Sequence, residues 1–183
     1  MKKGFALGVG ATLLVLLIGG YLLVISGYIP ANADATPSKL EYWMAKTSLR
    51  ATLKRESPKV PDPVPLTDSN LIAGIQLFQQ NCAICHGTAQ GNPAASNIAR
   101  GLYQKPPQLA SAGVEDDPPG VTFWKVYHGI RLTAMPSFRY TLTKQQIWTL
   151  ALFLKNMDHL PPAPEKVWKR VTNHLSLPPA GNS

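Results

Sequence analysis

The run Cys82-Ala83-Ile84-Cys85-His86 constrains this chain more than any other feature. A C-x-x-C-H run is the sequence pattern of a c-type haem attachment site. Two thiols on one short turn can bond to the two vinyl groups of one porphyrin, and the imidazole that follows can reach the iron. Cys82 and Cys85 are the only cysteines in the chain. The sequence therefore predicts one covalently attached haem c and no structural disulfide.

Two other uses of paired cysteines fit the sequence less well. A structural zinc ion needs about four ligands, and no second Cys/His pair lies near the run. A thioredoxin-like redox pair belongs beside a βαβ unit, and no alternation of strands and helices surrounds Cys82. The predicted metal is therefore the haem iron, with His86 as its proximal ligand.

The N-terminal segment has the composition of a membrane anchor. Residues 4–29 are almost wholly apolar and uncharged, and about 20 such residues suffice to span a bilayer. Lys2 and Lys3 supply the positive charge that stays on the cytoplasmic side. We expect residues 1–30 to anchor the chain in the bacterial inner membrane, with the haem domain in the periplasm. A signal peptide cleaved after Ala33 is the alternative, although its apolar core would be unusually long.

A linker, residues 31–66, follows the anchor. Residues 39–56 have the imperfect spacing of an amphipathic helix with a basic face. This helix can lie on the membrane with Trp43 at headgroup depth, or it can pack on the haem domain or a partner protein. In residues 59–65 three prolines at alternate positions exclude a helix and predict a stiff extended spacer.

The haem domain, residues 67–160, is predicted to be all-α, with no convincing pair of strands. Asp68 or Ser69 can cap its first helix, and Thr143 begins a capping-box pattern before its last one. Residues 87–119 are rich in Gly, Pro, Ala and Ser, and predict a long loop that packs on the haem. Helices are predicted over residues 70–80, 119–130 and 143–157, with a short one around 165–175 in the C-terminal extension, residues 161–183.

Met135 is the predicted sixth ligand of the iron, because a thioether sulfur favours low-spin iron and raises its potential. It lies 49 residues after His86, on an irregular stretch between two predicted helices that can cross the distal haem face. His128 is the rival, although a lone helical histidine is more often a surface or core residue. An open distal site is the third interpretation.

From Thr67 to Asp158 the chain resembles the class I c-type cytochromes. The resemblance rests on a helix that runs into C-A-I-C-H-G, a proline-bearing loop, the M-P-x-F pattern at Met135 and a C-terminal amphipathic helix with aromatic residues. It implies that the first and last helices of the domain cross, with a small residue on one against an aromatic on the other. The residues that would meet are Gly74 and Phe78 on the first helix, and Trp148 and Phe153 on the last.

The same resemblance implies two contacts around the haem. A backbone carbonyl in the proline region would accept a hydrogen bond from the outer N–H of His86, and Pro107 of the Pro106-Pro107 pair is the expected residue. Arg100 is the expected partner of a haem propionate, because an arginine fork suits a carboxylate. The alternative for Arg100 is an ordinary loop arginine that faces solvent.

The flanking segments are similar to those of membrane-anchored, single-haem cytochromes of bacterial dehydrogenases and respiratory chains. This resemblance implies a one-electron carrier and not an enzyme, with redox proteins as partners: a dehydrogenase, an oxidase or a soluble cytochrome. No small-molecule substrate is expected. The net charge of +8 contains no block of five or six basic residues, which argues against nucleic-acid binding.

Two other functions remain open at this point. One is a fixed cytochrome subunit of a larger oxidoreductase, which would explain the basic linker helix and Trp168 in the extension as docking segments. The alternative for the extension is an unstructured end with incidental aromatic residues. The other function is a haem-based gas sensor, which requires an open distal site.

Overall fold

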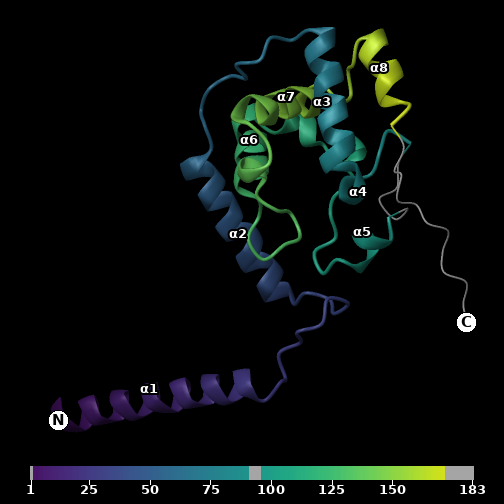
Figure 1. The fold of residues 1–183 in the computed structure, drawn as a ribbon. Coiled ribbons are helices and arrows are strands. Elements are labelled where there is room, and N and C mark those ends of the chain that lie inside the picture. The colour runs from purple at the N-terminus through teal and green to yellow at the C-terminus, as the bar shows by residue number, and fades with distance from the viewer. Residues whose placement is uncertain (1, 91–95, 172–183) are drawn as a thin grey trace, which may run out of the picture. The chain divides into compact units, whose positions relative to one another are not determined.

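The computed structural model describes residues 2–90 and 96–171. The chain divides into two compact units, Met1–Ala35 and Thr36–Ser183. Within the described residues every regular element is helical and none is a strand (Figure 1). The all-α prediction is therefore confirmed.

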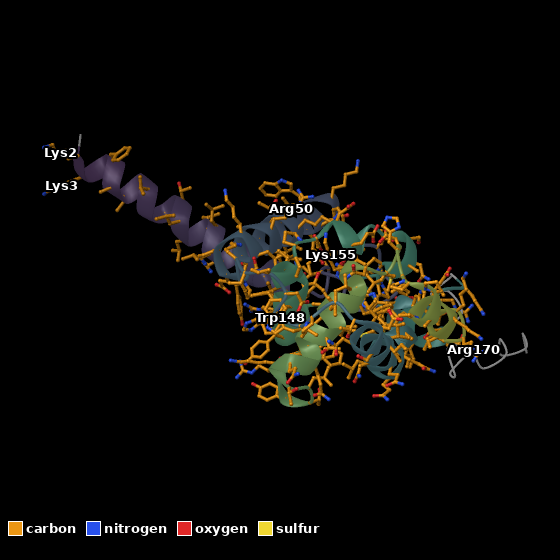
Figure 2. The ribbon with its side chains drawn as sticks, turned by 90° about the horizontal axis from the view of Figure 1, so that it is seen from above. Lys2, Lys3, Arg50, Trp148, Lys155 and Arg170 are labelled. Atoms are coloured by element: carbon orange, nitrogen blue, oxygen red, sulfur yellow. The ribbon has the colours of Figure 1, made fainter. Side chains whose placement is uncertain are left out.

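The first unit is built around one apolar helix, α1 (Lys2–Ile25). Of the described helices, it is the one that is long and apolar enough to cross a membrane. Lys2 and Lys3 stand at its N-terminal end (Figure 2). The Thr12 hydroxyl donates to the carbonyl of Gly8 at 2.9 Å, so this polar group is satisfied within the helix.

The core of the second unit is the crossing of α3 (Asp68–Asn81) with α7 (Lys144–Lys155). Thr67, and not the predicted Asp68 or Ser69, caps α3, because its hydroxyl accepts from the amide of Asn70 at 3.2 Å. The capping box predicted at Thr143 is confirmed. The side chains of the core that are fully buried include Leu71, Ile75, Phe78, Ile147, Leu150 and Phe153.

The two helices approach most closely at Gly74, as the resemblance implied. A Cβ atom on Gly74 would lie 2.6 Å from the Thr149 carbonyl oxygen and 2.6 Å from Phe153 Cβ. One turn later, Phe78 meets Phe153 edge-on, with ring centroids 5.7 Å apart. Trp148 differs from the expectation: its ring stacks on Phe123, at 4.3 Å between centroids.

Phe123 belongs to α6 (Pro119–His128), the third helix of the core. The prediction extended this helix to residue 130, but it ends at His128 because Gly129 takes a φ of +69°. The preceding loop is less irregular than predicted. Its described part holds α5 (Asn97–Gly101) and the short 3-10 helices η2 (Leu109–Ser111) and η3 (Val114–Asp116).

The C-terminal extension begins with a helix that completes the core, α8 (Pro162–Trp168). Trp168 is only 6% exposed, and its ring packs edge-on against Phe78 at 5.3 Å and Phe153 at 5.1 Å. The core therefore continues past the boundary expected after residue 160, and Trp168 is not exposed for a partner. The helix also begins earlier than predicted, because proline suits the first helical turn.

The linker contacts the rest of the second unit at several points. The linker helix has the predicted bounds, α2 (Lys39–Glu56), and the Tyr103 hydroxyl donates to both carboxylate oxygens of Glu41 at 2.8 Å. After α2, the Pro58 backbone passes so close to α6 that a Cβ atom on Gly120 would lie 2.0 Å from the Pro58 carbonyl oxygen.

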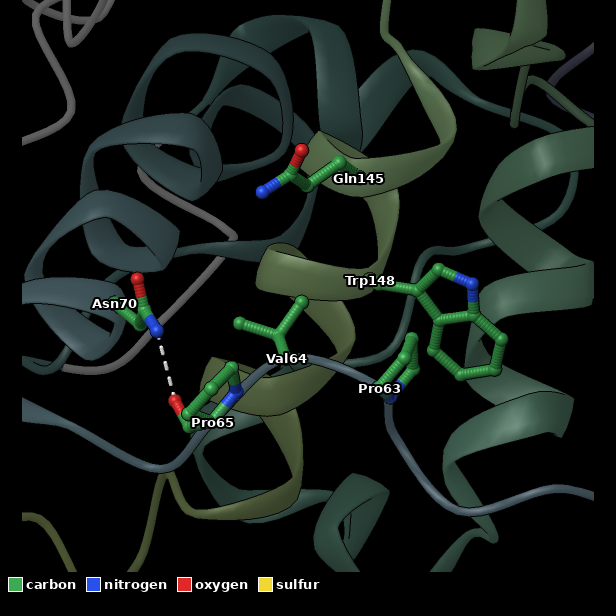
Figure 3. A pocket seen from close by; sticks show the side chains of 6 residues that line it. All are labelled: Pro63, Val64, Pro65, Asn70, Gln145 and Trp148. Carbon is green, nitrogen blue, oxygen red and sulfur yellow. Dashed lines mark hydrogen bonds between the residues drawn. The ribbon is translucent and has the colours of Figure 1, made fainter.

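The proline-rich segment contains no helix, as predicted, and it also packs on the rest of its unit. Val64 is buried in a small apolar cluster with Leu71 and Leu152. Asn70 donates a side-chain hydrogen bond to the Pro65 carbonyl at 2.8 Å (Figure 3). The segment borders a hollow of about 300 Å³ beside Trp148. Trp148 is distant in sequence from the C-x-x-C-H run. The segment packs on the protein because Val64, an apolar side chain between two prolines, is stabilised by leaving water.

We predict that Gly74→Ala destabilises the protein although alanine is the better helix former. The added methyl group would press on the backbone carbonyl of Thr149, which cannot swing aside, and overpacking of this kind costs about 1–3 kcal/mol. The midpoint of thermal unfolding, followed by circular dichroism on the detergent-purified full chain, should fall by several degrees. The matched control is Gly101→Ala, where nothing lies within 4 Å of the new Cβ atom. Equal midpoints for the two variants would contradict the close approach.

Candidate haem-binding site

The attachment turn follows directly from the end of α3. Cys82 ends α3, its amide donating to the Phe78 carbonyl at 2.8 Å, and α4 (Ala83–His86) begins at the next residue. The Cys82 carbonyl in turn accepts from the amides of Cys85 at 3.0 Å and His86 at 2.9 Å. One tight turn therefore carries both thiols and the imidazole, and the α3–α7 crossing fixes its position.

Both cysteines are free, and both sit in surroundings that keep a thiol neutral. Burial raises the pKa of the Cys82 thiol to about 12, and the nearby Cys85 adds to the rise. Burial raises the pKa of Cys85 as well. Thiolates are the form that exchanges disulfides, so these raised pKa values disfavour that role. Among the residues that the structure describes, no group of three or more His, Cys, Asp or Glu side chains could hold a separate metal ion.

His86 is held by the carbonyl that the resemblance indicated. Its Nδ1 atom lies 2.9 Å from the Pro107 carbonyl oxygen. Because a carbonyl can only accept, Nδ1 carries the proton and Nε2 keeps its lone pair. Burial lowers the pKa of His86, and the bond to Pro107 opposes part of that effect. The imidazole is therefore neutral, with its ring orientation fixed and Nε2 available to a metal.

A second contact holds the proline loop on the attachment turn, and the sequence analysis missed it. The side-chain amide of Gln108 donates to the Thr88 carbonyl at 3.2 Å. Together with the His86–Pro107 bond, it ties residues 107–108 to both sides of Gly87. No local pattern marks Gln108, because its partner lies 20 residues away in the sequence.

Met135 lies on the segment between α6 and the 3-10 helix η4 (Phe138–Tyr140). It is half-buried and packs against the hydrophobic cluster that contains Cys82 and Ala83. Its carbonyl accepts from the Ile130 amide at 3.1 Å, and its amide donates to the Thr133 hydroxyl at 3.1 Å. The structure thus brings Met135 to the same apolar cluster as the attachment turn, while its role as an iron ligand stays a prediction.

Gly129 and Ser137 set the path of the methionine segment. At Gly129, φ is +69°, and a Cβ atom would lie 2.7 Å from the Met135 carbonyl oxygen and 2.6 Å from the Pro136 carbonyl carbon. Beyond the methionine, the Ser137 hydroxyl donates to the Tyr127 carbonyl at 2.8 Å. The sequence analysis missed both residues, although a glycine just after the last periodic residue is a recognised signal of a helix end.

The other two predicted site residues lie at the surface. His128 is exposed on α6, and its ring packs on Trp124 and Tyr127 with centroids 4.8 and 4.9 Å away. Arg100 is exposed on α5, and its guanidinium donates to the side chain of Asn97. His128 therefore matches the surface interpretation, and the propionate role of Arg100 stays a prediction.

The donor set fits a covalently attached haem. One turn offers two neutral thiols and an imidazole whose Nε2 atom is free, and these groups adjoin an apolar cluster that includes a thioether. Histidine and methionine side chains are the ligands that hold haem iron in cytochromes c.

Comparison with known proteins places the domain in a class. Residues 69–154, from α3 into α7, match the family model described as cytochrome c oxidase, cbb3-type, subunit III. No significant match to the chain was found among curated proteins or among solved structures. The matched segment is a class I c-type cytochrome domain. Such a domain carries a covalent haem c with its iron and transfers electrons through it.

We predict that Gly129→Ala costs more stability than Gly113→Ala. Both glycines have a positive φ, but at Gly113 the nearest neighbour of a Cβ atom is a flexible carboxylate oxygen 3.5 Å away. At Gly129, where ψ is −173°, the backbone conformation is open almost only to glycine, and the methionine segment leaves no room. We expect a loss of about 2–3 kcal/mol against about 1 kcal/mol, measured by denaturant unfolding. A cost at Gly129 no larger than at Gly113 would show that the close approach is unimportant.

Proposed function

We propose that this protein is a membrane-tethered one-electron carrier with a single haem c, in a bacterial respiratory or dehydrogenase-linked electron-transfer chain. Thioether bonds to Cys82 and Cys85 would hold the haem, and His86 and Met135 would bind its iron. When bound, the haem supplies a one-electron ferric/ferrous couple. The observation that carries the proposal is the attachment turn, on which two free cysteines stand beside an imidazole oriented by Pro107.

The residues around the turn support a closed site rather than an enzyme. The Pro107 carbonyl keeps the proton on Nδ1 of His86, which would leave Nε2 available to the iron of a bound haem. Hydrogen bonds to Ile130 and Thr133 hold the backbone of Met135 in place. A pair of fixed protein ligands leaves no iron position for a substrate, so the protein would exchange electrons only.

Residues outside the matched domain support the membrane tether. The length and composition of α1 suit a single span, and Lys2 and Lys3 at its start suit a cytoplasmic N-terminus. The haem domain would then stand in the periplasm, where it would meet a dehydrogenase, an oxidase or a soluble cytochrome.

A second candidate function is that of a fixed cytochrome subunit in a larger oxidoreductase. The description of the matching family, a subunit of a cytochrome oxidase, favours it. So does the packing of Val64 and Glu41 against the haem domain, because it leaves only residues 26–38 as a connection on which the domain could swing. Purification in mild detergent separates the two functions: a fixed subunit copurifies in constant ratio with another redox chain, and a shuttle does not.

We predict that Cys82→Ala combined with Cys85→Ala abolishes covalent attachment of haem. Without the two thiols no thioether bond can form, whatever His86 and Met135 do. Haem staining of membranes after denaturing electrophoresis should show a band at the mass of the wild-type chain and none for the double variant. Detection of both chains by an affinity tag controls for expression, and a stained band in the double variant would refute the central assignment.

We predict that Met135→Ala keeps the covalent haem but opens the iron to carbon monoxide and lowers the reduction potential. Loss of the thioether removes the ligand that favours the reduced state. The measurement is the visible spectrum of the reduced, detergent-purified full chain with and without carbon monoxide, together with a redox titration.

Two matched variants complete this test. His128→Ala removes the surface histidine of α6, and Met157→Leu replaces a buried packing methionine. Both should leave the spectrum insensitive to carbon monoxide. Wild-type protein that already binds carbon monoxide would instead indicate an open distal site and favour gas sensing.

A further inference from the structure

One side of α2, the first helix after α1 in the sequence, exposes apolar side chains. Leu40, Trp43 and Met44 are 62, 62 and 50% exposed, and their spacing of three and four residues places them together on one side of the helix. Grouped exposed apolar residues of this kind mark a site of interaction.

The opposite side of α2 is already occupied by the protein itself. The Glu41 carboxylate accepts the hydrogen bond of the Tyr103 hydroxyl, and Leu49 and Leu53 are half-buried. The exposed group therefore cannot turn inward without breaking these contacts. None of the residues that the structure describes in this unit covers the exposed group, so an external surface is its candidate occupant.

Basic residues continue the exposed side along the next two turns. Lys46, Arg50 and Lys54 follow Trp43 at intervals of three, seven and eleven residues, and all three are exposed, with Arg50 visible at the surface in Figure 2. None of them forms an ion pair within the described residues, whereas Arg55 is paired with Glu56 at 2.6 Å. The side thus combines an apolar end with uncompensated positive charge. We call Leu40, Trp43, Met44, Lys46, Arg50 and Lys54 the outer face of α2.

We propose that the outer face of α2 docks on the anionic lipid surface of the membrane that holds α1. The three apolar side chains would enter the headgroup region, where tryptophan is favoured, and the cations would meet lipid phosphates. Thirteen residues, 26–38, separate α1 from α2, so even a fully extended connection keeps α2 within about 45 Å of the end of α1. This tether holds the outer face at a high effective concentration beside the bilayer.

Docking would orient the haem domain and not only retain it. Tyr103, which holds Glu41, belongs to the same loop as Pro107, so α2 is joined to the segment that contacts His86. A lipid contact on the outer face would therefore present a constant side of the domain to partners in the membrane. The inference rests on the membrane anchor of the proposed function and adds a second, charge-dependent contact.

The test uses the full haem-loaded chain in lipid nanodiscs and the fluorescence of Trp43. The signal of Trp43 is the difference between the wild type and Trp43→Phe. In discs that contain phosphatidylglycerol and brominated acyl chains, we expect this signal to be quenched. In discs of brominated phosphatidylcholine alone, or in 1 M salt, where the screening length is about 3 Å, the quenching should be largely lost.

Paired charge variants test whether docking depends on the positive charges of α2 or on the total charge of the protein. Arg50→Gln combined with Lys54→Gln should lower the ratio of docked to free α2 about 25-fold, at about fivefold for each basic residue near an anionic surface. Lys144→Gln combined with Lys166→Gln removes the same charge from exposed positions outside the linker and should leave the quenching unchanged.

Quenching that is absent from every disc, or equal in anionic and zwitterionic discs, would overturn the proposal. Absence of quenching would assign the outer face to a protein partner. Resistance of the full chain to alkaline carbonate extraction reports the α1 anchor separately, so a failed anchor and a failed docking surface give different results.

Discussion

The close approach of α3 and α7 at Gly74 is the contact on which the rest of the haem domain depends. Because no Cβ atom separates the helices there, Phe78 and Phe153 can meet one turn later and α8 can lay Trp168 across both rings. Cys82 follows Phe78 by one helical turn, and its amide donates a hydrogen bond to the Phe78 carbonyl. The position of the attachment turn is therefore set by helix packing. A site that is built in this way is rigid because its support is the core itself.

Around this turn, the groups that would serve the iron are held by backbone contacts from distant parts of the chain. The Pro107 carbonyl orients His86, and the tight passage at Gly129 guides the segment that carries Met135. Each contact fixes an orientation and contributes no charge to the site, which leaves the imidazole neutral. Such an arrangement suits electron transfer, because ligands that are held in place change little between the two oxidation states.

Linker residues pack on the haem domain, as the residues of a free spacer would not. Val64 is buried, the Pro58 backbone contacts Gly120, and Glu41 accepts a hydrogen bond from Tyr103. These contacts place α2 firmly on the haem domain and leave its basic and apolar side outward. In a carrier of the proposed kind, packing of the linker on the domain would trade reach for a more constant orientation.

The sequence alone determined what depends on neighbours within one or two turns: the C-x-x-C-H turn, the bounds of α2, the capping box at Thr143 and the apolar length of α1. It also indicated Pro107 and the approach at Gly74, through a resemblance to a known class. Only the tertiary structure decided that Trp168 completes the core, that Val64 is buried and that Trp148 stacks on Phe123. These three side chains pack against residues that are distant in the sequence. A local pattern of charge or hydropathy does not specify which distant residue will be the packing partner.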